Sequence, residues 1–327
     1  MASRDIPESD DRAGVPLSNP HDALFKFLFS QPENAAAELR TVLPKELSSR
    51  LDWASLALSP ASFVDERLKG READLLFSVR CQGRDAFLYL LLEHQSTSDV
   101  LMPFRLLRYV VRIWDAFLQG HPDARKLPAV IPVVIHHSDA GWSTPTELLA
   151  LIDLDEHALE AVSPFVPRFR FLLDDLAVGA DDTLRVRSEA AVATAGLLLL
   201  ARGRTSPDLL SDLWRWLDLF RSVVVAPNGL SALVALMTYA LDVGDIRPDD
   251  LYQFVRQLGP EATEAHMTGA QRLREEGKAD LLLRQLEFRF GPLPVAASGR
   301  VRNANPGEVE LWAERVLTAP DLDGVFR

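Results

Sequence analysis

One stretch of the chain, residues 71–96, constrains the fold more than any other. It contains two runs rich in apolar residues, Ala73–Cys81 and Asp85–Glu93, separated by a short polar turn that includes a glycine. Two such runs around a polar turn predict a β-hairpin. Antiparallel pairing would bring Asp74, at the start of the first strand, close to Glu93, at the end of the second.

The polar residues at this end of the hairpin predict a metal site. Because side chains alternate along a strand, Glu93 and Gln95 lie on the same side. Two carboxylates at the end of an apolar sheet repel each other, and their desolvation is costly. A divalent cation removes both problems, and Mg²⁺ is typically bound by one or two carboxylates together with substrate phosphate. We therefore expect Asp74 and Glu93 to bind Mg²⁺, with Mn²⁺ or Ca²⁺ as alternative ions.

The same residues resemble a known family. An Asp about twenty residues before Glu-x-Lys, at the end of an apolar strand, is the pattern of the PD-(D/E)XK nuclease fold; here Asp74 precedes Glu93 by 93 − 74 = 19 positions. The EHQS segment that starts at Glu93 has Gln95 at the usual lysine position, and HDALFKFLFS (21–30) and MPFRLLRY (102–109) flank it. Together they resemble the Rpn family of recombination-promoting nucleases, also described as PD-(D/E)XK putative transposases (YhgA-like). The similarity covers roughly residues 21–142, and LEFRFGPLP (286–294) is also family-like.

The resemblance implies an α/β (α+β) restriction-endonuclease-like core, with a small mixed sheet flanked by helices, and a metal-dependent DNA endonuclease activity. Asp74 and Glu93 would be the catalytic metal ligands, and the main-chain carbonyl of His94 would be a further ligand. Gln95 would be a catalytic residue that orients the attacking water or contacts phosphate. A glutamine lacks the positive charge of the usual lysine.

Three further residues are candidates for substrate binding. Asp22 and Lys26 are spaced i and i+4 on a helix predicted to begin near Pro20, so a surface ion pair is one interpretation. The resemblance implies instead that this helix borders the nuclease cleft. Arg105 belongs to a row of arginines on a helix predicted from Thr97 or Ser98 to about Gly120. Such a row is often a solvated face, but beside carboxylates an arginine is well suited to bind phosphate.

Composition limits the class of protein. A net charge of −12 and a pI near 5.1 argue against a broadly cationic nucleic-acid coat. A local basic cleft can still exist on an acidic protein. One cysteine excludes an internal disulfide and any CxxC metal site, which fits a reducing cytoplasm. The longest apolar run, Ala190–Ala201, is too short to span a bilayer, so we expect a soluble, cytoplasmic protein that does not enter membranes.

Three parts are predicted along the chain. Residues 1–19 are polar and form a disordered lead-in, residues 20–180 form the nuclease-like domain, and residues 186–327 form a helical domain. Besides the hairpin, strands are predicted at Ser62–Leu68, Leu127–His136 and Phe165–Leu173. The helices expected in the last part are Val186–Ala201, Pro207–Val224, Leu230–Leu241, Asp249–Leu258 and Glu261–Phe290.

Two functions remain open from the sequence. The first is an endonuclease with DNA as its partner, favoured by the joint presence of Asp74, Glu93 and Gln95. The second is a non-catalytic module that keeps the fold and binds a protein partner, or another copy of itself, through the C-terminal helices. The acidic net charge and the missing lysine favour this second function.

Overall fold

The computed structural model describes residues 19–59, 73–93, 99–138, 141–176, 190–203 and 205–327. The chain divides into two compact units, residues 1–251 and 252–327, and each is described by itself. The predicted strand Ser62–Leu68 and the lead-in at residues 1–18 lie outside the described residues.

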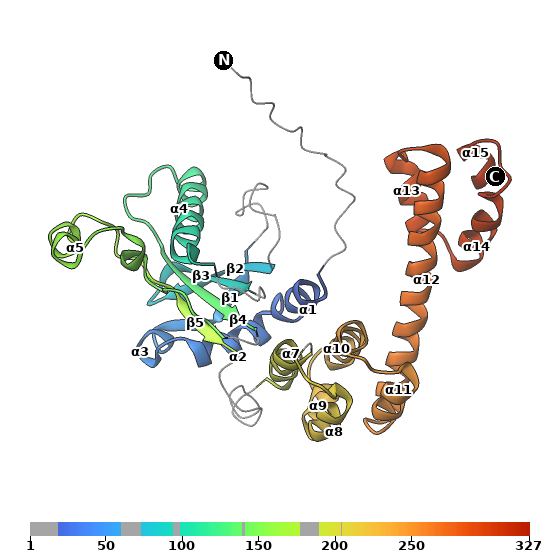
Figure 1. Ribbon diagram of the computed structural model, residues 1–327, viewed down its shortest axis with the longest axis horizontal. Coiled ribbons are helices and arrows are strands. Elements are labelled where there is room, and N and C mark those ends of the chain that lie inside the picture. Colours follow the sequence, from blue (N-terminus) through green and yellow to red (C-terminus); the bar gives the residue numbers. More distant parts are fainter. Residues whose placement is uncertain (1–18, 60–72, 94–98, 139–140, 177–189, 204) are drawn as a thin grey trace, which may run out of the picture. The chain divides into compact units, whose positions relative to one another are not determined.

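The first unit is organised around a five-stranded mixed sheet in the order β1-β2-β3-β4-β5 (Figure 1). The strands are β1 (Leu51–Leu58), β2 (Ala73–Cys81), β3 (Arg84–Glu93), β4 (Ala129–His136) and β5 (Leu172–Asp175). Strand β2 is antiparallel to both β1 and β3, whereas β4 runs parallel to β3 and β5 parallel to β4. The sheet therefore combines the expected hairpin with a parallel crossover, as an α/β fold requires.

The β2–β3 hairpin is confirmed. Gln82 and Gly83 connect the two strands with φ angles of 50° and 77°. Positive φ at both central residues is what a two-residue hairpin turn needs to match the twist of its strands. The pairing runs without interruption from Cys81–Arg84 to Ala73–Leu92.

Helices cover both faces of the sheet. Helix α4 (Met102–Gly120) carries the chain from β3 to β4, and its apolar stripe packs on one face. Figure 1 shows α1 (Pro20–Phe29) and α2 (Pro32–Val42) on the other side, followed by the short α3 (Lys45–Ser48). Burial on both faces explains why β3 and β4 are almost continuously apolar rather than alternating. The core under α4 includes Leu76, Phe87, Tyr89, Leu91, Met102, Leu106, Ile113, Phe117, Val134 and Phe171.

Some element boundaries differ from the predicted ones. Strand β1 was not expected, because it is an edge strand that is exposed at several positions and has an irregular register between Asp52 and Ala57. Helix α4 begins at Met102, later than predicted, because Asp99 forms a turn whose side chain accepts from the Leu101 N–H at 2.8 Å. Strand β5 begins at Leu172, near the end of the predicted Phe165–Leu173 strand.

From residue 191 onward every described element is a helix, as predicted. Helix α7 (Ala191–Arg202) is buried at nearly every position from Val192 to Leu200. It is apolar all round because it packs against α1 and α2 as well as α9 (Leu217–Val225) and α10 (Gly229–Val243). The predicted domain boundary at residues 180–186 therefore differs from the division of the chain at residue 251. The remaining helices of this unit are α5 (Glu156–Val162) and α8 (Leu209–Arg215), with a short 3₁₀ turn at Leu148–Leu151.

The second unit is built on the long helix α12 (Pro260–Phe290), which α11 (Pro248–Arg256) precedes. Helices α13 (Val295–Arg302), α14 (Pro306–Arg315) and α15 (Leu322–Phe326) complete it. Its core joins Leu282 and Leu286 of α12 to Trp312 of α14 and Phe326 of α15, whose rings meet edge to face at 4.9 Å. Among the described residues, none of the helices combines the length and apolarity that crossing a membrane requires.

Two residues of one helical turn test this assignment of core and surface. Leu286 is 0% exposed and Phe288 is 95% exposed. We expect Leu286→Ala to lower the free energy of unfolding of the second unit by about 2–5 kcal/mol, because it leaves a cavity. Phe288→Ala should change it by less than about 0.5 kcal/mol. Hydrogen exchange of the α12 and α14 amides measures both, and equal effects of the two substitutions would contradict the packing.

Candidate active site

Asp74 lies half-buried at the start of β2 and is the best-defined member of the site. Its Oδ2 accepts a hydrogen bond of 3.2 Å from the Tyr89 hydroxyl on the neighbouring strand. Burial raises the pKa of the Asp74 carboxyl above its usual value, and the Asp22 carboxylate acts in the same direction. The Lys26 ammonium and the Tyr89 hydrogen bond lower this pKa and offset part of the rise.

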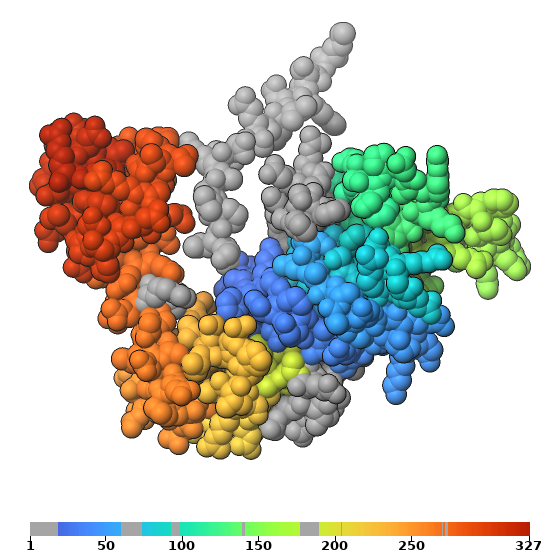
Figure 2. Space-filling view, turned by 180° about the vertical axis from the view of Figure 1, so that it is seen from behind, coloured from blue at the N-terminus to red at the C-terminus, as the bar shows by residue number. Residues whose placement is uncertain are grey.

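Helix α1 therefore borders the site. Asp22 and Lys26 both lie close enough to Asp74 to act on its charge. Figure 2 shows α1 (blue) directly beside the β2–β3 hairpin (cyan), and α1 contacts β2. Both residues therefore have Asp74 as a neighbour. A surface ion pair unrelated to the hairpin does not account for this. Their binding to substrate stays a prediction.

Glu93 is placed by the backbone register. Asp74 pairs with Leu91, and Leu91 lies two residues before Glu93, so positions 74 and 93 belong to the same face of the sheet. The side chain of Glu93, together with His94 and Gln95, lies outside the described residues. The distance between the two carboxylates, and the roles of His94 and Gln95, therefore stay predictions.

The parallel strands extend this row of positions. Glu93 pairs with His136 of β4, and His136 pairs with Asp175 of β5. The His136 Nε2 lies 2.9 Å from the Ser138 hydroxyl, and its ring meets Trp142 edge to face. The backbone N–H of Trp142 donates to Asp175 Oδ2 at 2.7 Å, which holds Trp142 against β5. Position 93 thus has a buried, hydrogen-bonded neighbour rather than a free strand edge.

The two adjacent histidines point to opposite faces, as their spacing predicts. His136 packs with Trp142, whereas the His137 ring lies 4.8 Å from the ring of His21 on α1. They cannot share a metal ion from opposite sides of the sheet.

Arg105 lies in the first turn of α4 and is held by Asp99. Its Nη1 is 3.1 Å from Asp99 Oδ2, and both side chains are half-buried. Asp99 also accepts from the Leu101 N–H, so the pair belongs to the turn that begins the helix. A phosphate at Arg105 would have to compete with this carboxylate, so the predicted substrate-binding role stays untested for this residue.

Tyr89 belongs to the candidate site although it was not predicted from the sequence. A signal for it exists in the alternation of β3, because positions 89, 91 and 93 share one face. Its hydroxyl reaches Asp74 diagonally across the hairpin, a distance that aromatic side chains can span. A buried tyrosine normally finds a hydrogen-bond partner for its hydroxyl, and here the partner is the candidate metal ligand.

The side chains present are compatible with a hard divalent cation. Asp74 is a carboxylate whose charge is disfavoured by burial, and a cation would restore the charged form. Within the described residues no group of three or more His, Cys, Asp or Glu side chains could hold a metal ion. A complete site therefore requires Glu93, whose position in the register is suitable.

Comparison with known proteins identifies the family. The family profile described as "Putative transposase, YhgA-like" matches residues 19–230. This chain belongs to that family. It is 32% identical over 265 residues to recombination-promoting nuclease RpnD of Escherichia coli O157:H7, covering 79% of this chain and 95% of that protein. It is also 32% identical over 264 residues to recombination-promoting nuclease RpnA of Escherichia coli strain K12, covering 80% and 85%.

The relatives include proteins named as nucleases and proteins named as inactive. The chain is 31% identical over 263 residues to "Inactive recombination-promoting nuclease-like protein RpnE" of Escherichia coli strain K12, covering 80% of this chain and 83% of that protein. No solved structure is significantly similar to this chain. The mixed five-stranded sheet is consistent with an α+β nuclease-like fold, and the finer PD-(D/E)XK assignment depends on the sequence pattern.

The raised pKa of Asp74 leads to a prediction about stability. When a carboxyl has a higher pKa in the folded than in the unfolded state, its ionisation lowers the stability of the folded protein as pH rises through the folded-state pKa. Asp74→Asn removes this loss and retains an acceptor for Tyr89. In the presence of EDTA, the variant should therefore melt at a higher temperature than the wild type at neutral pH, and the difference should vanish below about pH 4.

Asp85→Asn on the same hairpin is the control. Asp85 is exposed and pairs with exposed Arg80 at 3.3 Å, an interaction that contributes little to stability. Thermal melting from acid to neutral pH compares the three proteins. An Asp74→Asn protein that is less stable than the wild type at neutral pH would show that the ionised carboxylate stabilises the fold.

Proposed function

We propose that this protein is a Mg²⁺-dependent DNA endonuclease that hydrolyses phosphodiester bonds at the end of the β2–β3 hairpin. The observation that carries the proposal is Asp74, a half-buried carboxylate with a raised pKa on the same sheet face as position 93. Membership of a family with relatives named as recombination-promoting nucleases supports it. Mn²⁺ or Ca²⁺ are alternative ions for the same oxygen ligands.

The residues have separate roles in this proposal. Asp74 and Glu93 hold the cation, together with the His94 carbonyl. When bound, the cation lowers the pKa of a water molecule and stabilises the negative charge that develops on the phosphate. Tyr89 orients the Asp74 carboxylate by donating to Oδ2, and Gln95 orients the attacking water or contacts phosphate.

Helix α1 supplies charge that Gln95 cannot. A glutamine is neutral, so the positive charge found at this motif position in many nucleases is missing. Lys26 places an ammonium group beside Asp74 from a different element of the chain. We assign Lys26 to phosphate binding. Asp22, on the same helix, is assigned to the substrate-binding residues beside Asp74. Arg105 would join them if phosphate displaced it from Asp99.

Cleavage of supercoiled plasmid tests the mechanism. Asp74→Ala and Glu93→Ala should each reduce Mg²⁺-dependent cleavage at least about 100-fold, because each removes a ligand that stabilises the transition state. Gln95→Ala should reduce cleavage less. Gln95→Lys should keep or raise it, because it restores the common form of the motif. Asp85→Ala, at the far end of the hairpin, is the matched control and should cleave like the wild type.

Ion binding separates a lost ligand from a damaged fold. The rise in melting temperature on adding Mg²⁺ or Mn²⁺ should shrink in Asp74→Ala and Glu93→Ala, since this shift follows the affinity for the ion. Wild-type activity in the Asp74→Ala, Glu93→Ala double variant would sink the proposal and indicate another site or a contaminant.

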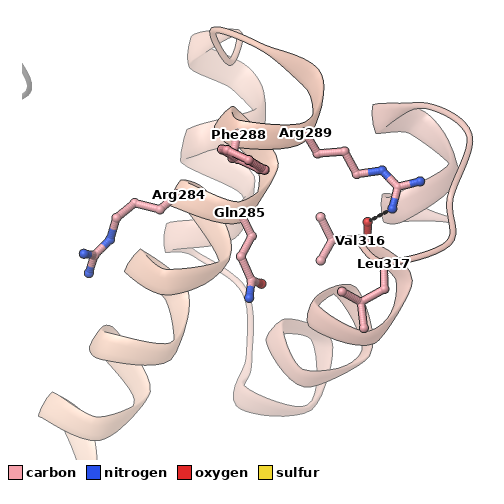
Figure 3. Close-up of a pocket in the computed structure, with 6 residues that line it drawn as sticks. All are labelled: Arg284, Gln285, Phe288, Arg289, Val316 and Leu317. Carbon is pink, nitrogen blue, oxygen red and sulfur yellow. Dashed lines mark hydrogen bonds between the residues drawn. The ribbon is translucent and has the colours of Figure 1, made fainter. Parts of the chain in front are cut away.

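A second function, binding of a protein partner by the C-terminal unit, is favoured by one surface feature. A hollow of about 380 Å³ lies between α12 and the segment after α14, lined by Phe288, Leu317 and their neighbours (Figure 3). Phe288 and Leu317 are 95% and 72% exposed, which is unusual for large apolar side chains at one place. Arg284 and Arg289 flank the hollow. An apolar hollow with a cationic rim fits an acidic amphipathic helix of a partner protein.

Synthetic peptides test this second function. A helical peptide with an apolar stripe flanked by glutamates should bind, whereas the same peptide with lysines should bind at least about tenfold more weakly. Phe288→Ser should weaken binding of the acidic peptide about tenfold, and Val295→Ser, at an equally exposed residue outside the hollow, should not. Equal binding of the two peptides would exclude this partner. Self-association that Phe288→Ser abolishes would identify a second copy of the chain as the occupant.

A further inference from the structure

A buried hydrogen bond joins the first helix of the protein to α10. The Tyr239 hydroxyl lies 2.6 Å from His21 Nδ1, although the two residues are 218 positions apart in the chain. Both side chains are buried, at 3% and 2% exposure. The His21 ring also lies 4.8 Å from the ring of His137 at the end of β4. We call these three residues, from α1, α10 and the end of β4, the His21 junction.

The His21 junction fixes the rotation of α1 about its axis more tightly than apolar packing alone does. Leu24, Phe25, Leu28 and Phe29 already give α1 a buried apolar face. An apolar face tolerates small rotations of the helix, whereas a short hydrogen bond between buried rings does not. If α1 turned, the hydroxyl would lose its partner in a place that water does not reach, and this costs more than an average hydrogen bond contributes.

The junction lies at the N-terminal end of α1, the helix that also carries Asp22 and Lys26. The helix begins there, because the Asn19 side chain accepts from the His21 N–H at 3.1 Å. Asp22 follows His21 directly, and Lys26 lies just over one turn further along the helix. The rotation of α1 about its axis therefore determines where both charges stand relative to Asp74.

We propose that Tyr239 and His21 are positioning residues of the nuclease site, and that their hydrogen bond holds α1 so that Asp22 and Lys26 face Asp74. This inference rests on the proposed endonuclease function. It makes α10, most of which lies beyond the residues 19–230 that the family profile matches, a working part of the site. A fragment that ends near residue 180 would keep Asp74 and Glu93 but lack the residue that orients α1.

Two substitutions on α10 give a matched comparison. Tyr239→Phe removes only the hydroxyl that reaches His21. Thr238→Val, one residue earlier, removes a hydroxyl that bonds to the Val234 carbonyl within the same helix. We expect Tyr239→Phe to lower kcat for plasmid cleavage about 5–10-fold, because the phosphate-binding charge is misplaced. Thr238→Val should stay within about twofold of the wild type.

A double-mutant cycle separates positioning from general damage. In a Lys26→Ala background the charge that α1 positions is already absent, so Tyr239→Phe should cause no further loss of activity. A merely structural effect of Tyr239→Phe would lower activity by the same factor in both backgrounds, and that result would overturn the inference. His21→Asn, whose side-chain oxygen takes the place of Nδ1 and can still accept from Tyr239, should retain more activity than His21→Leu. Equal losses in the two His21 variants would also count against it.

Hydrogen exchange of α1 gives a readout that does not need activity. The α1 amides should exchange faster in Tyr239→Phe than in Thr238→Val, in EDTA as well as in Mg²⁺. If the wild type cleaves and Tyr239→Phe cleaves equally well, the inference is wrong and the endonuclease proposal stands. If the wild type does not cleave, the endonuclease proposal is wrong. If hydrogen exchange of the α1 amides were also the same in Tyr239→Phe as in the wild type, the hydrogen bond would not position α1 and the inference would be wrong too.

Discussion

The pairing of β2 with β3 is the constraint on which the candidate site depends. With Asp74 opposite Leu91, the Asp74 carboxylate shares a face with Tyr89 and with position 93. A slip of one residue would move Asp74 to the opposite face and separate it from both. The register is protected against such a slip by the two-residue turn at Gln82 and Gly83 and by burial of β3 on both faces. The same interactions that stabilise the sheet therefore assemble the site.

Features that depend on residues close together in the chain could be predicted from the sequence, whereas contacts between distant residues could not. The hairpin, α1 and β4 were predictable because apolar spacing, turn residues and caps all act within about ten residues. Strand β1 was not, because an exposed edge strand with an irregular register has neither clear alternation nor a continuous apolar run. The bond between His21 and Tyr239 was beyond reach for a different reason. It joins residues 218 positions apart, and no local pattern marks either of them as a partner of the other.

The helices after residue 190 show how far the fold extends around the site. Their all-helical character was predictable, but their attachment was not, since periodicity says which residues are buried and not against what. Helix α7 is buried on nearly all sides because α1 and α2 lie against it. Helix α1 therefore packs against both the sheet and helices α7 and α10. Because α10 contacts α1, the stability of α10 can limit local motion of α1 beside the site.

The net charge of the protein is strongly negative, so any attraction of a nucleic acid has to come from a few cationic side chains near the candidate site. At a net charge of −12, the protein would repel DNA at long range, so the proposed endonuclease function requires a few cationic groups close to the scissile phosphate. Lys26 stands beside Asp74, whereas Arg105 is paired with Asp99. A bound divalent cation would add positive charge where Asp74 now carries a disfavoured negative one. Under the proposed endonuclease function, the metal ion would support both catalysis and the attraction of DNA, because burial raises the pKa of Asp74 and a cation would offset the cost of its charge.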